Sequence, residues 1–251
     1  AIANDEEGQI LLDMDCGEGY DRSTLDLLGD QEKLMQALIE TGKPLVVVYI
    51  QGRTLKMNLA AEKANALLTA WYPGGEGGHG IADVLFGDYN PAGRLPVSIP
   101  RNEGQLPIYY SKGKQRDYMD GDANALYSFG YGLSYTKFEY SDLQIKPGNG
   151  KDVLQTVTCT VKNTGNCDGQ EIVQLYIRDM VASVAQAPIL LKAFERITLK
   201  KGESKTVTFN LGKKELSIYN MNLEEVVEPG EFKVMVGAAS NDIRLNGKFE
   251  L

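Results

Sequence analysis

A change in hydrophobic periodicity near residue 136 is the feature that most constrains how this chain can fold. Before it, apolar residues recur at helical spacing or form short continuous runs, a combination typical of helices packed on buried strands. After it, apolar and polar residues alternate, as in strands with one face in a core. The 251 residues therefore predict two domains, an α/β domain at residues 1–135 and an all-β domain at residues 136–251.

The first pattern predicts a partial α/β sandwich with a mostly parallel sheet. Residues 45–50, LVVVYI, form an apolar run without polar interruption, which favours a strand buried on both faces. Helices alternate with strands along this half, and βαβ units place consecutive strands parallel to one another. The elements expected are helices from Asp30 to Gly42, at 59–66 and at 76–86, and strands at 45–50 and 66–71.

The second pattern predicts an antiparallel β-sandwich, which the chain reaches through an ordered connector. Segments such as QEIVQLYIRD and ESKTVTFNL alternate with a period of two and are separated by turns. The connector, residues 88–135, is rich in Gly, Pro, Asn, Asp and Tyr, and long loops in compact proteins are usually functional or held by their own side chains. Recurrent aromatic residues favour an ordered connector: Tyr109, Tyr110, Tyr118, Tyr127, Phe129, Tyr131 and Tyr135.

The charge balance is acidic, with a formal net charge of −8. This argues against nucleic acid and against anionic membrane surfaces as partners, because both are bound through basic patches. No apolar run approaches the roughly 20 residues that a membrane-spanning helix needs. The sequence therefore predicts neither nucleic acid nor membrane among its partners.

The cysteines and the single histidine limit the chemistry. Cys16, Cys159 and Cys167 are odd in number and lack CxxC spacing, so they predict neither a disulfide framework nor a zinc site. Free thiols are the favoured interpretation, and a Cys159–Cys167 bridge across a turn is the alternative. His79 alone excludes a histidine-rich metal cluster, and no G-x-S-x-G nucleophile elbow accompanies it.

Two acidic stretches and one glycine-rich stretch admit metal or cofactor interpretations. DMD (13–15) and DGD (120–122) do not complete an EF-hand loop and are interpreted as solvated turns. GGEGGHG (74–80) matches G-x-G-x-x-G between a predicted strand and a predicted helix, the context of a dinucleotide site. The next segment is not a strand that ends in a ribose-binding acid. A tight glycine turn is therefore preferred, and neither a metal nor a cofactor is expected.

The stretch CGEGYDRSTLDL at residues 16–27 holds the strongest catalytic candidate. Glu18 stands between two glycines, and an acid in that position is most often part of a solvated turn. The glycines also expose its carboxylate to a ligand. Asp21 and Arg22 are spaced to form a local ion pair that stiffens the loop and holds the acid in position.

Five stretches in order resemble the glycoside hydrolase family 3 enzymes, which include β-glucosidases and β-xylosidases. EGYDRSTLDLLGDQEKLMQALIETGKPLVVVYIQGR resembles the family's E-G-x-D-R block and the buried strand that follows it. AWYPGGEGGHGIADVLFGDYNPAGRLPVSIP resembles its most recognisable signature, and LYSFGYGLSYTKFEYSDL its junction into the last domain. VKNTGNCDGQEIVQLYI and VEPGEFKVMVGAASNDIRL are similar to its C-terminal fibronectin type III-like domain.

The resemblance implies a shared active site that this chain completes only in part. In complete members a TIM-like barrel supplies the nucleophilic Asp, and the α/β domain supplies the general acid/base Glu, which corresponds to Glu18 here. Asp21 and Arg22 would support that loop. Tyr20, Trp71 and Tyr72 are candidate substrate-binding residues, although structural packing is the commoner role of such aromatics.

The chain also departs from the family pattern. The barrel, which takes roughly 250 residues, is absent together with the opening strands of the α/β domain. Cys16 and Leu28 stand where many members have Glu and Pro. We therefore expect a C-terminal piece or one subunit of a β-glucosidase-like enzyme, inactive by itself.

The resemblance also indicates partners and a compartment. The expected partners are a β-glucoside or oligosaccharide substrate and the N-terminal barrel portion, and a homodimer is compatible with the pattern. The resemblance favours a periplasmic or secreted location and leaves the cytoplasm open. The alternative function is a non-catalytic module that binds carbohydrate or a partner chain, and a dinucleotide enzyme is a distant third.

Overall fold

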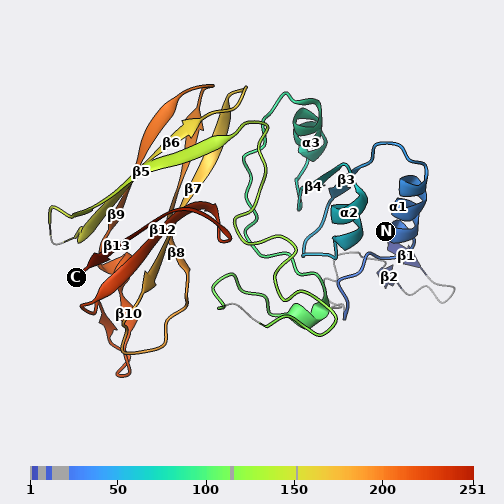
Figure 1. The fold of residues 1–251 in the computed structure, drawn as a ribbon. Helices are drawn as coiled ribbons and strands as arrows, with labels where there is room; N and C mark the ends of the chain where they lie inside the picture. The colour runs from blue at the N-terminus through green and yellow to red at the C-terminus, as the bar shows by residue number, and fades with distance from the viewer. Residues whose placement is uncertain (1, 5–9, 13–22, 114–115, 151) are drawn as a thin grey trace. The chain divides into compact units, whose positions relative to one another are not determined.

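The computed structural model describes residues 2–4, 10–12, 23–113, 116–150 and 152–251. These residues form two compact units (Figure 1). Unit 1 comprises Ala1–Leu85 and Ile99–Pro107, and unit 2 comprises Phe86–Ser98 and Ile108–Leu251. Residues 86–98 and most of the connector therefore pack with the C-terminal sandwich.

Unit 1 contains the helices and strands that the first sequence pattern predicts, within a few residues of the expected bounds. β3 and β4 pair in parallel, in the register Val46↔Ala66 to Tyr49↔Thr69. β1 and β2 form a separate antiparallel pair. The elements in chain order are β1 (Ile2–Asn4), β2 (Ile10–Leu12), α1 (Gln31–Glu40), β3 (Val46–Tyr49), α2 (Asn58–Lys63), β4 (Ala66–Thr69), α3 (Gly77–Phe86) and the 3₁₀ helix η1 (Glu103–Gln105).

The expectation of a mostly parallel sheet is not confirmed. Among the residues that the structure describes, the parallel sheet consists of β3 and β4 alone. Residues 45–50 also differ from a strand buried on both faces. Tyr49 is buried, but Val46 is 47% exposed and Ile50 is 62% exposed. A two-stranded sheet leaves one edge of each strand uncovered, so apolar positions near those edges stay open to solvent.

Helix α1 begins where the sequence predicts, but without the side-chain cap that an Asp at this position commonly provides. Asp30 precedes it and makes no side-chain cap to its backbone. The carboxylate instead accepts a hydrogen bond from the Lys33 ammonium at 2.8 Å. Met35 faces the core, whereas Leu34 is 62% exposed. The helix therefore buries a narrower stripe than its apolar content implies.

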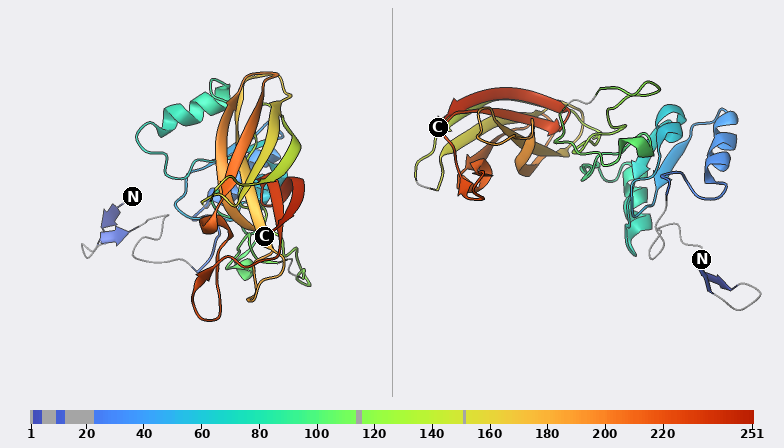
Figure 2. Two further views of the ribbon diagram at one scale, coloured as in Figure 1. Left: turned by 90° about the vertical axis from the view of Figure 1, so that its left-hand side faces the viewer. Right: turned by 90° about the horizontal axis from the view of Figure 1, so that it is seen from below.

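Unit 2 is a β-sandwich of a four-stranded and a three-stranded antiparallel sheet, which can be followed in Figure 2. The strand orders are β13-β12-β7-β8 and β5-β6-β9, and a short hairpin, β10-β11, follows helix α4. The bounds are β5 (Phe138–Pro147), β6 (Gln155–Asn163), β7 (Gly169–Asp179), β8 (Leu190–Leu199), β9 (Ser204–Leu211), α4 (Lys213–Leu216), β10 (Ile218–Tyr219), β11 (Glu225–Val226), β12 (Glu231–Ala239) and β13 (Asp242–Glu250).

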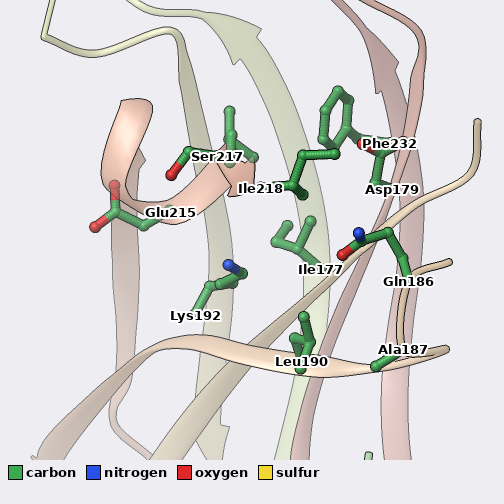
Figure 3. A pocket seen from close by; sticks show the side chains of 11 residues that line it. Ile177, Asp179, Gln186, Ala187, Leu190, Lys192, Glu215, Ser217, Ile218 and Phe232 are labelled. Carbon is green, nitrogen blue, oxygen red and sulfur yellow. The ribbon is translucent and has the colours of Figure 1, made fainter. Parts of the chain in front are cut away.

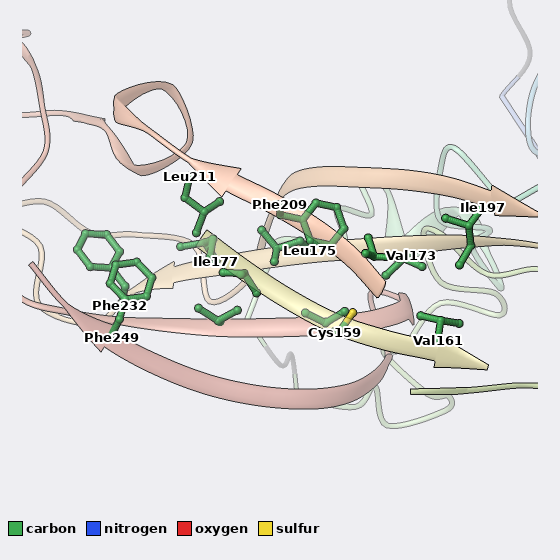
Figure 4. Close-up of a cluster of buried hydrophobic side chains, with 14 of the residues drawn as sticks. Cys159, Val161, Val173, Leu175, Ile177, Ile197, Phe209, Leu211, Phe232 and Phe249 are labelled. Atoms are coloured by element: carbon green, nitrogen blue, oxygen red, sulfur yellow. The ribbon is translucent and has the colours of Figure 1, made fainter. Parts of the chain in front are cut away.

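The core of unit 2 forms where the inward positions of the two sheets meet (Figure 4). In β6 every second residue is buried, including Val157, Cys159 and Val161. The alternation predicted for this half therefore matches the observed burial. Phe232 and Phe249 close one end of the core, with stacked ring centroids 5.2 Å apart. Aromatic pairs of this kind add to the free energy gained from buried area alone.

Strand β7 departs from alternation because both of its faces are covered. Tyr176 lies on the face away from the core, yet it is fully buried. The connector covers it: the Tyr110 ring lies edge-on to Tyr176 at 6.1 Å and stacks on Phe129 at 4.4 Å. Gln174 donates to the carbonyls of Gly130 and Ala238. Tyr110 and Phe129 thus hold the connector against the sandwich, and the connector is ordered there, as the sequence predicts.

The thiols of unit 2 are free. Cys159 is buried, Cys167 is exposed, and the two are not bonded to each other. The alternative of a Cys159–Cys167 bridge is therefore wrong, because strand β6 places Cys159 in the core while Cys167 lies in the turn that follows. Cys16 lies outside the described residues.

Candidate functional site at the carboxyl edge of β3 and β4

The candidate catalytic loop lies outside the described residues. Glu18, Tyr20, Asp21 and Arg22 all belong to residues 13–22, so the roles given to them from sequence stay predictions. The other two candidate site residues, Trp71 and Tyr72, follow β4 and are described. The geometry of the site is therefore built from β3, β4 and the segments that leave them.

Both segments leave the same edge of the sheet. β3 and β4 run parallel, so residues 50–54 after β3 and residues 70–76 after β4 start side by side (Figure 1). The backbone N–H of Gln51 donates to the carbonyl of Trp71 at 3.3 Å, which joins the two segments just beyond the strands. In open α/β sheets, ligands bind outside the carboxyl ends of the strands. This edge is therefore the candidate binding site of unit 1.

Trp71 adopts a backbone conformation that bulky residues rarely take. Its φ is 53°, in the left-handed region. For a residue other than Gly, Asn or Asp this costs about 1–2 kcal/mol, and such conformations persist only where the surroundings enforce them. The side chain is half-buried. A strained aromatic at the carboxyl edge of a parallel pair is a feature that functional sites often share.

Gln51 is the residue that fixes this edge from inside. It is 3% exposed, and its amide makes two hydrogen bonds. Nε2 donates to the Thr69 hydroxyl at 3.0 Å, and Oε1 accepts from the backbone N–H of Leu55 at 3.2 Å. One side chain therefore links the end of β4 to the segment after β3. With the Gln51 N–H on Trp71, two hydrogen bonds of one residue join the two sides, and the third, from Leu55, orders the segment after β3.

Tyr72 lies against the backbone of Gly52. A methyl group added at Gly52 would be 2.3 Å from the Tyr72 hydroxyl oxygen and 2.5 Å from its ring carbon Cζ, far inside contact distance. Only a residue without a side chain leaves this space. Tyr72 is nevertheless 65% exposed, so its ring is supported on one side and presented to solvent on the other.

The glycine-rich segment beyond Tyr72 forms a packed turn into α3. A Cβ at Gly77 would lie 2.5 Å from Cγ of Pro73, so this glycine is required for close packing. His79 and Glu76 are exposed and pair with each other, with Nδ1 2.7 Å from Oε2. Residues 88–98, which follow α3, contain neither helix nor strand. Gly74 and Gly75 thus form a tight turn, and Gly77 begins α3, packed against Pro73; a tight glycine turn is the interpretation preferred from sequence.

The segment that leaves the candidate catalytic loop is firmly anchored. Leu25 is buried, its N–H donates to the Glu103 carboxylate at 2.7 Å, and its carbonyl accepts from the N–H of Lys56 at 2.7 Å. The hydrogen bond from Leu25 lowers the pKa of Glu103 below its ordinary value. Lys56 also binds Asp26, which raises the pKa of the Lys56 ammonium.

Tyr49, at the end of β3, completes this anchor. Its hydroxyl donates to the carbonyl of Lys56 at 3.3 Å. Burial, with a smaller contribution from the charge of Glu32, raises the pKa of Tyr49 to about 12. Tyr49 therefore stays neutral at working pH and keeps its hydrogen bond. The chain is fixed only a few residues after Glu18.

A hollow opens in unit 2, and its character differs from that of the β3 and β4 edge. It encloses about 270 Å³, counting the space open to solvent, and its floor is apolar (Figure 3). Two acids line it, but both serve the local backbone: Asp179 accepts from the N–H of Val181 and Glu215 from that of Gly212. Burial lowers the pKa of Lys192 at its rim, and Glu215 partly offsets this. The Oδ2 atom of Asp179 is buried and has no hydrogen-bond partner in the part of the chain that the structure describes, so local contacts account for the hollow only in part.

Sequence reasoning proposed Trp71 and Tyr72 as site residues, which stays a prediction, and it did not single out Gln51 and Gly52, which contact them. Gln51 and Gly52 directly follow the apolar run of β3, and a polar residue and a glycine at the carboxyl end of a parallel strand are a usable signal.

The acidic stretch DGD (120–122) behaves as a local turn, as interpreted from sequence. Asp122 accepts from the backbone and side chain of Asn124, each at 2.7 Å.

Comparison with known proteins identifies the class of this chain. The family model described as "Glycosyl hydrolase family 3 C-terminal domain" matches residues 2–135, and the model described as "Fibronectin type III-like domain" matches residues 171–240. The fold is thus that of a glycosidase C-terminal domain followed by a fibronectin-like sandwich. Because the first match covers more than half of its residues, the chain belongs to glycoside hydrolase family 3, which confirms the resemblance seen in the sequence.

Individual relatives agree with this assignment. A "Beta-xylosidase" of Formosa agariphila is 47% identical over 90% of this chain and 32% of its own length. A "Periplasmic beta-glucosidase" of Salmonella typhimurium is 42% identical over 93% of this chain and 32% of its own length. The structure of a β-glucosidase from Listeria innocua in complex with glucose superposes with a TM-score of 0.86 at 38% identity, over 93% of this chain and 34% of that one. The chain spans about one third of the length of these relatives.

Proposed function

We propose that this chain is the C-terminal part of a retaining β-glycosidase that hydrolyses terminal β-linked sugars. The observation that carries the proposal is the family match across residues 2–135, which includes the E-G-x-D-R stretch at Glu18. Relatives named as β-glucosidases and β-xylosidases support the reaction class. In this proposal Glu18 is the general acid/base, and a TIM-barrel segment outside this chain supplies the Asp nucleophile.

The chemistry requires two carboxyl groups with different protonation states. A retaining glycosidase places them roughly 5–5.5 Å apart on opposite sides of the glycosidic bond. The nucleophile must be ionised, whereas the acid must hold a proton for the leaving oxygen. Desolvation and a neighbouring negative charge both raise the pKa of a carboxyl group. Glu18 would gain both only when the barrel and the sugar close around it.

Two features of unit 1 favour this role for the loop at residues 16–22. The segment that follows it is fixed through both backbone groups of Leu25, which places a rigid point a few residues after Glu18. Asp21 and Arg22 would stiffen the loop further by pairing with each other. A proton donor must be held within a fraction of an ångström of its target, and a short loop on a rigid anchor meets this need.

The remaining site residues are proposed to contact the sugar. Trp71 and Tyr72 lie at the carboxyl edge of the parallel strands, and Tyr72 offers a largely exposed ring. Tyr20, two residues from Glu18, would add an aromatic side chain beside the acid. Aromatic residues with a polar tip suit a surface that is partly buried and partly wet.

The proposed domains are residues 1–135 and 136–251, and the proposed partner is the N-terminal barrel portion of the same enzyme.

We also propose a periplasmic or extracellular location, because one relative is named periplasmic. In the part of the chain that the structure describes, no helix is long and apolar enough to cross a membrane. A homodimer is proposed as the assembly, and sedimentation equilibrium would measure it.

The role of Glu18 is tested in a form of the protein that carries the barrel. Glu18→Gln should slow turnover by about 10²–10⁴-fold. The loss should be smallest for aryl glucosides whose leaving groups need no proton, and azide should restore part of the rate. Glu62→Gln, an exposed acid on α2, is the control and should leave turnover unchanged. Equal loss across all leaving groups, without rescue by azide, would show that Glu18 is not the acid.

The division of labour between barrel and C-terminal part has its own test. The 251-residue chain alone should not hydrolyse an aryl β-glucoside, because it lacks the nucleophile that the proposal places in the barrel. Hydrolysis by the purified chain, with the same Glu18 dependence, would contradict that placement. The second candidate function is a non-catalytic module that binds carbohydrate or a partner chain. Tight binding of cellulose or xylan by a barrel-containing but inactive protein would support it.

A further inference from the structure

We propose that Gln51 and Gly52 are positioning residues for a sugar subsite, in which Tyr72 and Trp71 contact the apolar face of a β-linked pyranose. The ligand class rests on the proposed glycosidase function. The geometry of the subsite rests only on the residues of unit 1. Neither Gln51 nor Gly52 is among the residues that the sequence marks as functional.

Gly52 acts through Tyr72. The ring leans on the glycine backbone and fills the space where a side chain would stand: a Cβ added at Gly52 would lie 2.7 Å from the ring carbon Cε2 and closer still to the hydroxyl oxygen. This contact supports one edge of the ring while 65% of the residue remains exposed. Fixing an exposed aromatic side chain before a ligand arrives reduces the entropy that binding must overcome.

Gln51 acts through Trp71. The left-handed backbone of Trp71 costs free energy, so it needs a surrounding structure that enforces it. Gln51 supplies part of that structure through its N–H to the Trp71 carbonyl and through its side-chain bond to Thr69, two residues earlier. Its buried amide has both polar atoms satisfied, which is the arrangement that gives a single conformation.

The chemistry of this edge suits a neutral sugar. Tyr72 presents an aromatic face and a hydroxyl, and ligand sites combine apolar area with a few placed polar groups. A β-linked glucose or xylose carries its ring substituents equatorially, so its C–H groups form a flat apolar face that an aromatic ring can cover. An α-linked disaccharide is bent at its linkage and offers a less continuous face.

Trp71 provides the measurement, because it is the only tryptophan in the 251 residues. Its fluorescence, excited where tyrosine does not absorb, reports directly on the segment after β4. Titration of the 251-residue chain with cellobiose and with xylobiose should change its emission in a saturable way. Maltose, the α-linked comparison, should bind at least about threefold more weakly.

Matched variants then separate positioning from general stability. Gly52→Ala forces the far end of the Tyr72 side chain to move, and should weaken cellobiose binding about three- to tenfold, the size of one aromatic contact. Gly78→Ala is the control, because a methyl at this helical glycine meets nothing within 4 Å. Tyr72→Ala should weaken binding similarly. Gly52→Ala should add nothing in the Tyr72→Ala background.

The glutamine is tested in the same way. Gln51→Met keeps the size of the side chain and removes both of its hydrogen bonds, so it should shift the Trp71 emission and weaken binding about three- to tenfold. Gln36→Met, at an exposed position on α1, should change neither.

Three outcomes would overturn the inference. These are an emission that does not respond to either β-linked disaccharide, binding that Gly52→Ala leaves unchanged, and equal losses of binding for Gly52→Ala and Gly78→Ala. These outcomes are distinct from failure of the proposed catalysis, which depends on Glu18 and the barrel. The proposed subsite would remain supported if Glu18→Gln kept full activity. The role of Glu18 would remain supported if the fluorescence of Trp71 did not respond to either disaccharide.

Discussion

The buried ion pair between Arg94 and Glu171 gives the sharpest stability prediction for unit 2. Arg94 Nη2 donates to Glu171 Oε2 at 2.8 Å, and the two side chains are only 8% and 2% exposed. Glu171 Oε1 accepts from the Tyr140 hydroxyl at 2.9 Å. We expect Arg94→Met to destabilise the sandwich strongly, because it leaves the Glu171 carboxylate buried with a single partner.

The magnitude follows from the burial. Removing one partner of a buried ion pair typically costs about 3–5 kcal/mol, whereas replacing both partners by apolar residues is often close to neutral. Arg94→Met and Glu171→Met should each fall in that range. The double variant should lose less than the sum of the two, with a coupling energy of about 2 kcal/mol or more. Burial, and then the charge of Glu171, raises the pKa of Tyr140, so Tyr140 remains a donor throughout.

The assay is urea denaturation followed by far-UV circular dichroism, which is dominated here by strands. Lys205→Met is the matched control, because Lys205 pairs with Glu195 at 3.5 Å with half of its side chain exposed. Exposed pairs contribute about 0.2–1 kcal/mol. The reasoning is refuted if Arg94→Met lowers the free energy of unfolding no more than Lys205→Met does. It is also refuted if the losses of the two single variants simply add in the double variant.

Three further predictions concern single groups. Glu103→Gln should make the stability of the protein less sensitive to acid. The pKa of Glu103 is lowered in the folded state, so the stabilisation from its carboxylate is present above its ordinary pKa of 4.5 and is lost as pH falls through the folded value. Urea denaturation at several pH values will measure this. Gly130→Ala should lower the urea midpoint more than Gly202→Ala. Both glycines have positive φ, but only a methyl group at Gly130 would meet another side chain, the buried amide of Gln174. Peptide mapping after thiol alkylation should find Cys167 labelled in the native protein and Cys159 only after unfolding, since burial raises the pKa of Cys159 to about 11.

The elements themselves could be predicted from the sequence because their causes are local. Helical spacing, a continuous apolar run and a period of two each reflect which face of a short segment meets a core. Helices α1 to α3, strands β3 and β4, and the alternation of β6 accordingly appear where the sequence places them, whereas β1, β2 and η1 were not predicted. The family could also be identified, because five stretches in order carry far more information than any one motif.

Burial and partners were less predictable. The sequence of residues 45–50 predicts a fully buried strand, but Ile50 is 62% exposed. Exposure depends on which strands lie beside β3 and not on the sequence of β3 itself. Asp30 has the residue type of a helix cap and instead binds Lys33. In both cases the local signal was right about the element and wrong about its surroundings.

The sequence by itself determined that a helix-containing part precedes an antiparallel β-sandwich, the family, and the acid Glu18 as the residue to test, since each depends on patterns within a few dozen residues. Only the tertiary structure decided that Gly52 supports Tyr72, that Gln51 holds the strained Trp71, and that Arg94 pairs with a glutamate 77 residues away. The physical reason is that side-chain partners are chosen by packing in three dimensions. Residues far apart along the chain become neighbours only after the sheets and loops have come together.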